Sequence, residues 1–277
     1  MRLIGIGDNT VDDYTHMRTL FPGGNALNVA VYARQLGCES AYLGVFGSDA
    51  AAAHMQQTLA ELGVDNSRSC TADGPSGRAT LIFEDGERVF TGSNEGGIRK
   101  SVSMDFIFDD IDYLQTFSIA HTSAYSYIDA QLERLQPLVP TLSYDFSDDF
   151  DTERALSLCR YVDVAFFSCS AWTEAATRDL LKQAVSCGCA LAVATRGPLG
   201  AILFDGQAWF RQAPQALAAK DTLGAGDAFI SGFLVTWAGS EAGGGPAASI
   251  EQSLARAASL AAEVCQVQGA FGHGLRY

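Results

Sequence analysis

The chain has 277 residues, of which 48% are hydrophobic and 18% are charged, so it carries enough apolar sequence for one large α/β domain with a buried core. Its formal net charge of −14 argues against nucleic acid or an anionic membrane surface as the main partner. No apolar run reaches the roughly 18 residues of a membrane span, and the first residues resemble a strand instead of a signal peptide, so we expect a soluble, cytoplasmic protein.

Short apolar runs alternate with helical patterns along most of the chain. The predicted strands are 2–7, 41–45, 119–122, 141–146, 162–167 and 190–195, and the predicted helices are 25–37, 50–62, 130–138, 173–187, 225–237 and 250–267. Strands that alternate with helices indicate a central, mostly parallel sheet between two helical layers. We therefore predict a single three-layer α/β/α domain over residues 1–277.

Two segments, about 12–20 and 77–97, interrupt this alternation. In the second, "RATLIFEDGERVF" predicts two strands joined by a turn at Asp85 and Gly86. Together the two segments predict a small antiparallel flap outside the main sheet. The glycine-rich stretch 239–249 predicts a surface loop between the last two helices.

The seven cysteines and four histidines are dispersed, and the close cysteine pairs lack the spacing of a zinc site. This distribution is typical of free thiols in a reducing compartment and gives no support for a metal cluster built on histidine. Any binding of a polyanion such as a nucleotide must then depend on local backbone geometry and a metal ion.

The stretch "DTLGAGDAF" at residues 221–229 places two glycines at the start of an apolar helix. Gly224 and Gly226 leave the first-turn amides without side-chain cover, so the positive end of the helix is open to an anion. Asp227 lies in the same turn, where a carboxylate repels a phosphoryl group unless its task is to take a proton from an attacking hydroxyl. The alternative is that Asp221 and Asp227 only cap the helix and favour its dipole.

Two motifs, "GGNALNVAVYARQLG" at 23–37 and "DTLGAGDAFISGF" at 221–233, resemble the amino- and carboxy-terminal signatures of the ribokinase-like (PfkB) family of carbohydrate kinases. They stand in the expected order, about 200 residues apart, and two motifs in register are far more specific than one. The resemblance covers almost the whole chain. It implies a ribokinase-like fold with the flap as a lid, and a homodimer formed through that flap.

In this family, the aspartate matching Asp227 is the catalytic base. The amides matching residues 223–227, with Gly224, Ala225 and Gly226 at their centre, stabilise the transferring phosphoryl group. The resemblance also implies a sugar site made of Asp8, Asp12, Gly23, Gly24, Asn25 and Asn28. Plainer roles stay open: Asn25 as a helix N-cap, and Asp12 and Asp13 as solvated loop residues.

The segment "ATRGPLGAILFDG" at 194–206 resembles the nucleotide side of the family site. The predicted ATP-binding residues are Thr195, Gly197, Gly200, Asp221 and Thr222. Taken alone, the 195–200 pattern also fits a tight turn into a strand at 201–204.

Magnesium is expected to screen the triphosphate, and a monovalent cation is a further cofactor that the resemblance admits. Most family members carry Asn-x-x-Glu to order the magnesium, whereas this chain has Ser168-Cys169-Ser170-Ala171. Asp145 and Glu174 are the remaining candidate metal-side carboxylates, with the alternative that Asp145 helps to cap the helix that follows.

Within the family, "GDNTVDDY", "YDFSDDFD" and "AFFSCSAWTE" are most similar to fructoselysine and other fructosamine kinases. This similarity implies phosphorylation of the terminal 6-hydroxyl of a sugar–amino-acid conjugate. Four acidic residues of the predicted flap would suit an ammonium group on such a ligand, although charged hairpins are usually only solvated: Glu84, Asp85, Glu87 and Glu95.

Three other functions are weighed against this one. The first is a kinase for another simple sugar, of the fructose or ribose type, and the second is a non-catalytic sugar sensor, suggested by the missing Asn-x-x-Glu. The third is a dinucleotide-dependent oxidoreductase, which "GIGDN" supports poorly because no third glycine follows Gly5 and Gly7 at the required spacing.

Overall fold

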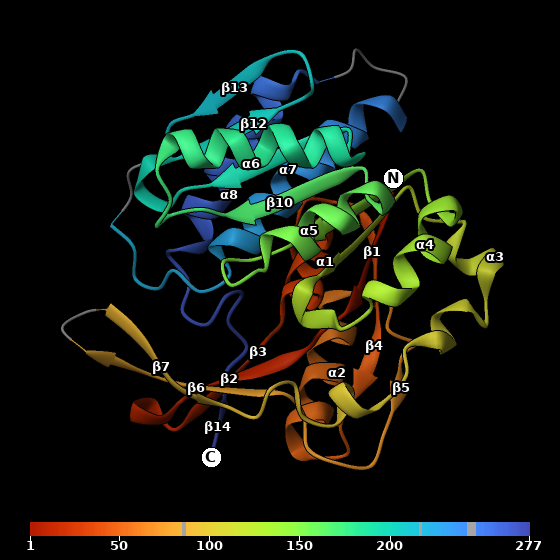
Figure 1. Ribbon diagram of the computed structural model, residues 1–277. Coiled ribbons are helices and arrows are strands. Elements are labelled where there is room, and N and C mark those ends of the chain that lie inside the picture. The colour runs from red at the N-terminus through yellow and green to blue at the C-terminus, as the bar shows by residue number, and fades with distance from the viewer. Residues whose placement is uncertain (85–86, 216–217, 243–247) are drawn as a thin grey trace.

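The computed structural model describes residues 1–84, 87–215, 218–242 and 248–277. Its main sheet has nine strands in the order β13-β12-β11-β10-β9-β8-β1-β4-β5, parallel except at β12 and β13 (Figure 1). The strands are β1 (Arg2–Gly7), β4 (Glu39–Phe46), β5 (Cys70–Thr71), β8 (Ile119–Ser123), β9 (Thr141–Asp145), β10 (Val164–Ser168), β11 (Leu191–Thr195), β12 (Ala201–Phe204) and β13 (Trp209–Gln212).

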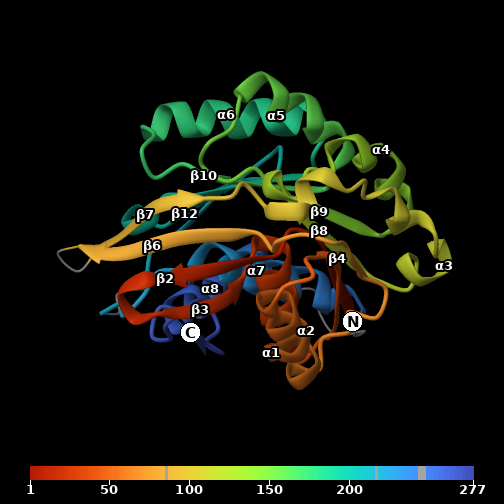
Figure 2. The same ribbon diagram turned by 90° about the horizontal axis from the view of Figure 1, so that it is seen from below.

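Helices cover both faces of this sheet (Figure 2). One face carries α3 (Ile111–Leu114), α4 (Leu132–Leu135), α5 (Thr152–Leu158) and α6 (Glu174–Cys187), and the other carries α1 (Asn25–Gln35), α2 (Ala50–Leu62), α7 (Ala225–Ala242) and α8 (Ile250–Val264). Alternate residues of β1 serve the two cores: Leu3 packs with α1 and α7, whereas Ile4 and Ile6 pack with α4 and α6. The predicted α/β/α architecture is therefore confirmed.

A second sheet of five strands lies beside the main one, in the order β14-β3-β2-β6-β7. Its strands are β2 (Thr10–Tyr14), β3 (Thr19–Gly23), β6 (Arg78–Glu84), β7 (Glu87–Ser93) and β14 (Leu275–Arg276). This sheet occupies the place of the predicted flap, but it is mixed: β2 and β6 run parallel, and the end of the chain adds β14. The predicted turn at Asp85 and Gly86 lies outside the described residues.

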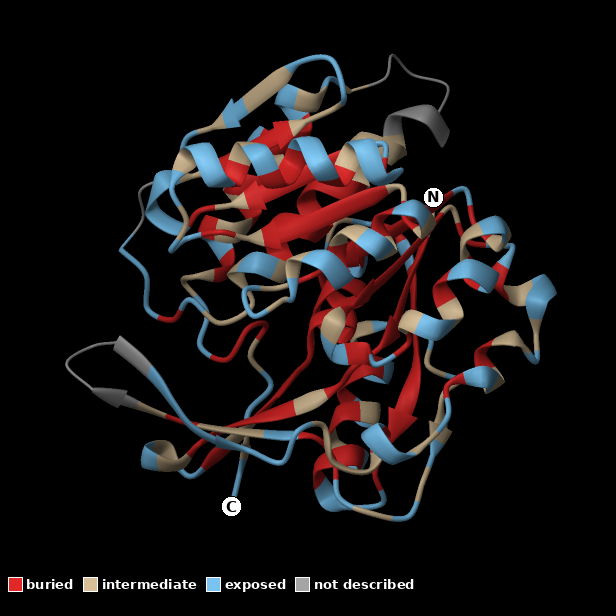
Figure 3. Ribbon diagram, viewed as in Figure 1, coloured by how far each residue is buried: buried red, intermediate tan, exposed pale blue. Residues whose placement is uncertain are grey.

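The flap ribbon is far more exposed than the main sheet (Figure 3). Residues 89–93 of β7 are exposed one after another, so neither face of that strand is covered. By contrast, every residue of β8 and β9 is buried.

The sequence-based elements differ from the structure at three places: a broken helix, a helix end and a missed strand. The helix predicted over 130–138 is broken into turns around α4, because Pro137 lacks an amide hydrogen and disfavours helical geometry before it. Helix α7 continues to Ala242, past the predicted end at 237 and into the predicted loop. Strand β13, which pairs with β12, was not predicted.

All seven cysteines are free thiols. Within the described ranges, no helix combines the length and the apolar character needed to cross a membrane.

Candidate active site

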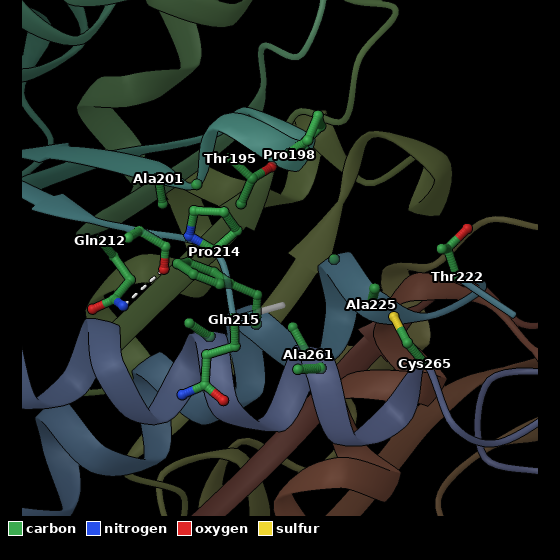
Figure 4. Close-up of a pocket in the computed structure, with 17 residues that line it drawn as sticks. Thr195, Pro198, Ala201, Gln212, Pro214, Gln215, Thr222, Ala225, Ala261 and Cys265 are labelled. Atoms are coloured by element: carbon green, nitrogen blue, oxygen red, sulfur yellow. Dashed lines mark hydrogen bonds between the residues drawn. The ribbon is translucent and has the colours of Figure 1, made fainter. Parts of the chain in front are cut away.

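Two cavities meet at the first turn of α7. The α8 cavity, of about 450 Å³, lies between α8, the loop after β13 and the turn after β11 (Figure 4). The flap cavity, of about 620 Å³, lies between the carboxyl ends of the main strands, α1 and the flap. Gly226 lines both cavities. The carboxyl ends of parallel strands are where ligands bind in open α/β sheets.

The two glycines at the start of α7 have different tasks. Gly224 has φ +75°, and a methyl group there would lie 2.4 Å from Tyr32 Oη, so the backbone turn requires glycine. A methyl group on Gly226 would meet no atom within 4 Å, because this glycine faces the open space between the cavities. Gly226 therefore keeps the passage between the cavities clear.

Not all of the amides predicted to hold a phosphoryl group are available. The Leu223 amide donates to Asp221 Oδ1 at 3.0 Å, and the Ala225 amide donates to the Thr222 carbonyl at 3.3 Å. These two N–H groups shape the turn itself.

Asp227 is held by both asparagines of the first signature. Asn25 Nδ2 donates to Asp227 Oδ1 at 2.7 Å, and Asn28 Nδ2 donates to Asp227 Oδ2 at 2.6 Å. The two asparagines lie one turn apart on α1, so they reach the two carboxylate oxygens together. Residues about 200 positions apart in the sequence thus form one polar cluster.

The orientation of the Asn25 amide is fixed by a buried histidine that the sequence analysis did not single out. His121 Nε2 lies 2.8 Å from Asn25 Oδ1, and His121 Nδ1 lies 2.6 Å from Ser143 Oγ. Burial lowers the pKa of His121 to about 3, so its ring is neutral at pH 7. Since Asn25 Oδ1 can only accept, Nε2 carries the proton and Ser143 donates to Nδ1. The Asn25 amino group is thereby turned toward the carboxylates.

Asp145 shares the Asn25 amino group with Asp227. Asn25 Nδ2 also donates to Asp145 Oδ2 at 2.8 Å, and the Ser147 amide donates to Asp145 Oδ1 at 2.9 Å. Burial raises the pKa of Asp145 to about 7, and the nearby negative charge of Asp227 acts in the same direction. One buried carboxyl group of the site therefore titrates close to neutral pH.

Asp8 lines the flap cavity, but its oxygens are used within the protein. They accept from the amides of Asn25 at 2.5 Å and Ala26 at 3.1 Å, and from the hydroxyls of Ser123 at 2.9 Å and Ser126 at 3.0 Å. Helix α1 has no side-chain cap from its own N-cap residue, Gly24. Asp8, the residue directly after β1, thus supplies that cap and holds the asparagine-bearing turn in place.

The neighbouring acidic pair on β2 is buried, which excludes the solvated-loop alternative. Asp12 lines the flap cavity, and its Oδ2 would lie 2.4 Å from a methyl group on Gly23, so the two residues are in close contact. Asp13 forms an ion pair with Arg78 and accepts from Tyr277 Oη at 2.8 Å. Asp13 therefore ties the flap strands to the end of the chain.

The predicted nucleotide residues fall into two groups. Thr195, Gly197, Gly200 and Thr222 line the α8 cavity. Asp221 is buried instead: it accepts from Tyr14 Oη, from the Gly269 amide at 2.9 Å and from the Leu223 amide. The structure thus places Asp221 as an organiser of the turn.

The two candidate metal-side carboxylates lie in different surroundings. Glu174 forms ion pairs with Arg178, Arg196 and Arg211, and Arg178 above all holds the pKa of Glu174 below its usual range. Asp145 lines the flap cavity with Asp227. In the part of the chain that the structure describes, no group of three or more His, Cys, Asp or Glu side chains could hold a metal ion.

Comparison with known families identifies the chain. Residues 1–272 match the pfkB family of carbohydrate kinases. The chain belongs to this family. It is 40% identical to a fructosamine kinase of Bacillus subtilis over 278 aligned residues, covering 100% of this chain and 95% of the relative. It is 33% identical to the fructoselysine 6-kinase of Escherichia coli, covering 97% and 99% of the two chains.

Solved structures of sugar kinases share the fold. The fructokinase of Xylella fastidiosa with bound ATP has a TM-score of 0.82 at 20% identity, covering 98% of this chain and 94% of that one. The ribokinase of Arabidopsis thaliana with ribose and ATP has a TM-score of 0.79 at 19% identity, covering 99% and 96%. The family resemblance and the ribokinase-like fold predicted from the sequence are both confirmed.

Proposed function

We propose that this PfkB kinase transfers the γ-phosphoryl group of ATP to the terminal 6-hydroxyl of a fructosamine, with Asp227 as the general base. The observation that carries the proposal is that Asp227 lines the flap cavity and directly follows Gly226, which lines both cavities. The two curated relatives described above, a fructosamine kinase and a fructoselysine 6-kinase, support the substrate class.

The chemistry requires one proton transfer and one bond exchange. Asp227 takes the proton of the sugar hydroxyl, the hydroxyl oxygen bonds to the γ-phosphorus, and the bond to the β,γ-bridging oxygen breaks, so that ADP leaves with that electron pair. A carboxylate has about four lone-pair sites, so Asp227 can accept this proton while it still accepts from Asn25 and Asn28.

We assign the phosphoryl contacts to the amides of Gly224 and Gly226, because the amides of Leu223 and Ala225 donate within the turn. Asn28 Oδ1 is buried and has no hydrogen-bond partner in the described part of the chain, which makes it an acceptor for a sugar hydroxyl. Asp12 is the second sugar contact, and Asp8 acts by positioning α1.

The α8 cavity is the proposed ATP site. Its described lining is uncharged and mostly small, including Pro214, Ala225 and Ala261, as suits a planar base (Figure 4). Magnesium fits as an ion carried by the triphosphate, since it usually keeps several waters and uses one or two carboxylates. Asp145 is the better placed of the two candidates, because Glu174 is engaged by arginines. A dependence on a monovalent cation stays a prediction.

A panel assay tests the proposal. ADP release is measured with ATP, Mg²⁺ and, in turn, fructoselysine, fructose and ribose. The proposal expects the highest kcat/KM with fructoselysine. A preference for fructose or ribose would assign the enzyme to a simple sugar, and sugar binding without ADP release would favour the sensor.

The predicted dimer is also kept as a proposal. The exposed run 89–93 of β7 leaves a sheet edge open, and a two-fold contact between flaps would cover it. Sedimentation of the protein and of a Val89→Asp variant is expected to give a dimer and a monomer, respectively. A monomeric wild type would rule the flap dimer out.

A further inference from the structure

Arg99 is a buried cation that has no anionic partner among the residues that the structure describes. It lies in the 3-10 turn Gly97–Ser101, directly after the flap, and is 5% exposed. Its Nε and Nη1 are buried and have no hydrogen-bond partner within the described residues, and the guanidinium lies over the face of the Tyr127 ring, 4.9 Å from its centre. Burying a guanidinium with unpaired donors costs stability, so the arrangement points to a missing anion.

The guanidinium belongs to the flap cavity. Arg99 lines this cavity together with Gly96 and Tyr127, and its Nη2 would lie 2.6 Å from a methyl group on Gly96. The charged residues that line the cavity, among those the structure describes, are otherwise carboxylates: Asp8, Asp12, Glu95, Asp145, Asp148 and Asp227. None of them forms an ion pair with Arg99 in the described chain, while Glu95 pairs with Lys100. Among the described lining residues, Arg99 is therefore the one cation that a ligand in this cavity would meet. It lies on a different element from Asp227.

Exposed aromatic residues flank this cation. Phe90, Tyr125 and Tyr127 line the same cavity and are 55%, 48% and 48% exposed. Exposed apolar surface gathered around a cavity is typical of a binding site. The cavity, at about 620 Å³, falls in the range of roughly 300–1,000 Å³ that holds ligands larger than a single hexose.

We propose that Arg99 binds the carboxylate of the amino-acid part of the substrate, while the aromatic residues pack against its aliphatic stem. This inference rests on the proposed fructosamine function. The planar guanidinium can give a carboxylate two parallel N–H···O bonds, which a lysine cannot reproduce. Arg99 would then distinguish a sugar–amino-acid conjugate from a bare sugar, whereas Asp227 acts on the hydroxyl.

The test compares two conjugates that differ only in the carboxylate: fructoselysine and the fructosamine of cadaverine, which keeps both nitrogens and the methylene chain. The enzymes are the wild type, Arg99→Gln and Arg99→Lys. Lys100→Gln is the matched control, because it removes the neighbouring positive charge from an exposed side chain paired with Glu95. KM and kcat are measured for each pair, with the KM for ATP and thermal unfolding as checks on the fold.

We expect the wild type and Lys100→Gln to bind fructoselysine with a KM roughly ten- to a hundredfold below that of the cadaverine conjugate, the range for hydrogen bonds to a charged group. In Arg99→Gln, the ratio of the KM for the cadaverine conjugate to the KM for fructoselysine falls toward one. In Arg99→Lys, this ratio lies between the values of Arg99→Gln and the wild type. If Arg99→Gln still phosphorylates both conjugates and the ratio of their KM values is unchanged, Arg99 does not bind the carboxylate, and the inference is overturned. Failure to phosphorylate either conjugate, with turnover of fructose, overturns the proposed function itself.

A phosphate on the sugar is the other anion that Arg99 could hold. Fructose 6-phosphate has no free 6-hydroxyl, so the additional substrate is fructose 1-phosphate, compared with fructose. The proposal is overturned if the wild type has a lower KM for fructose 1-phosphate than for fructose, this difference is lost in Arg99→Gln, and the wild type shows no preference between the two conjugates. Arg99 would then bind a phosphate group instead of a carboxylate.

Discussion

The two cavities that meet at Gly226 differ in charge. The α8 cavity has no charged residue in its described lining, whereas the flap cavity carries several carboxylates and the Arg99 guanidinium. Under the proposed function, a triphosphate would be repelled by the carboxylates of the flap cavity and would meet no such repulsion in the uncharged α8 cavity. This difference in charge supports the proposed placement of ATP in the α8 cavity and of the sugar in the flap cavity.

The largest expected effect tests the acidic side. Asp227→Asn should lower kcat by roughly two to four orders of magnitude, the range for a lost general base, with little change in the KM for ATP. Steady-state ADP release measures both constants. Asp149→Asn is the control, since Asp149 is an exposed acid that directly follows the cavity-lining Asp148 and does not itself line the flap cavity. An unchanged kcat in Asp227→Asn would refute the proposed mechanism.

The second prediction concerns positioning on the same side. His121→Phe removes the donor to Asn25, so the Asn25 amide can turn its oxygen toward Asp227, and kcat should fall roughly ten- to a hundredfold. His121→Gln keeps an N–H donor and should recover part of that loss. If His121 only fills space, the two variants will have the same kcat. Thermal unfolding of both variants shows whether a lower kcat reflects a loss of folded protein instead.

A third variant acts on the neutral side. Ala261→Phe places a ring in the α8 cavity and should raise the KM for ATP roughly tenfold, equivalent to about 1.4 kcal/mol of binding, with the sugar KM unchanged. Ala255→Phe, on the exposed side of the same helix, is the control. A rise confined to the sugar KM would reverse the assignment of the two cavities.

The smallest effect is on stability. The pKa of Asp145 is about 7 in the folded protein against 3.8 for the isolated group, so between these values the folded state binds more protons and stability decreases as pH rises. Asp145→Asn removes this dependence. We expect its Tm to exceed that of the wild type at pH 8 by at least roughly 2–4 °C, and by less at pH 5, in thermal unfolding with EDTA. A larger gain at pH 5 would contradict the raised pKa.

Features that depend on residues close together in the sequence could be predicted, whereas features that depend on distant residues could not. The helix starts at Asn25 and Ala225 are local features, signalled by glycines and apolar spacing, and both were located correctly. The break at Pro137 was also signalled locally but was overlooked. By contrast, no pattern marks His121, which sits in a fully buried strand, or Arg99, which follows a glycine turn.

The site residues show the same division. Asp227 was singled out because a carboxylate in a turn expected to bind a phosphoryl group repels that group unless it acts as a base, and this argument needs only one turn of sequence. The tasks of Asp8 and Asp221 were not accessible in this way. Their partners lie far along the chain: Asp8 contacts Ser126, 118 positions on, and Asp221 contacts Tyr14, 207 positions back.

By itself, the sequence determined the alternation of strands and helices, the family and the two glycine-bearing helix starts, because spacing and turn chemistry act over a few residues. Only the tertiary structure decided which buried acids hold the protein together, which face the cavities, and that Arg99 and the Asn25–His121 pair belong to the flap-side site. Burial and charge at a position depend on the neighbours that folding brings to it, and one sequence does not specify those neighbours locally.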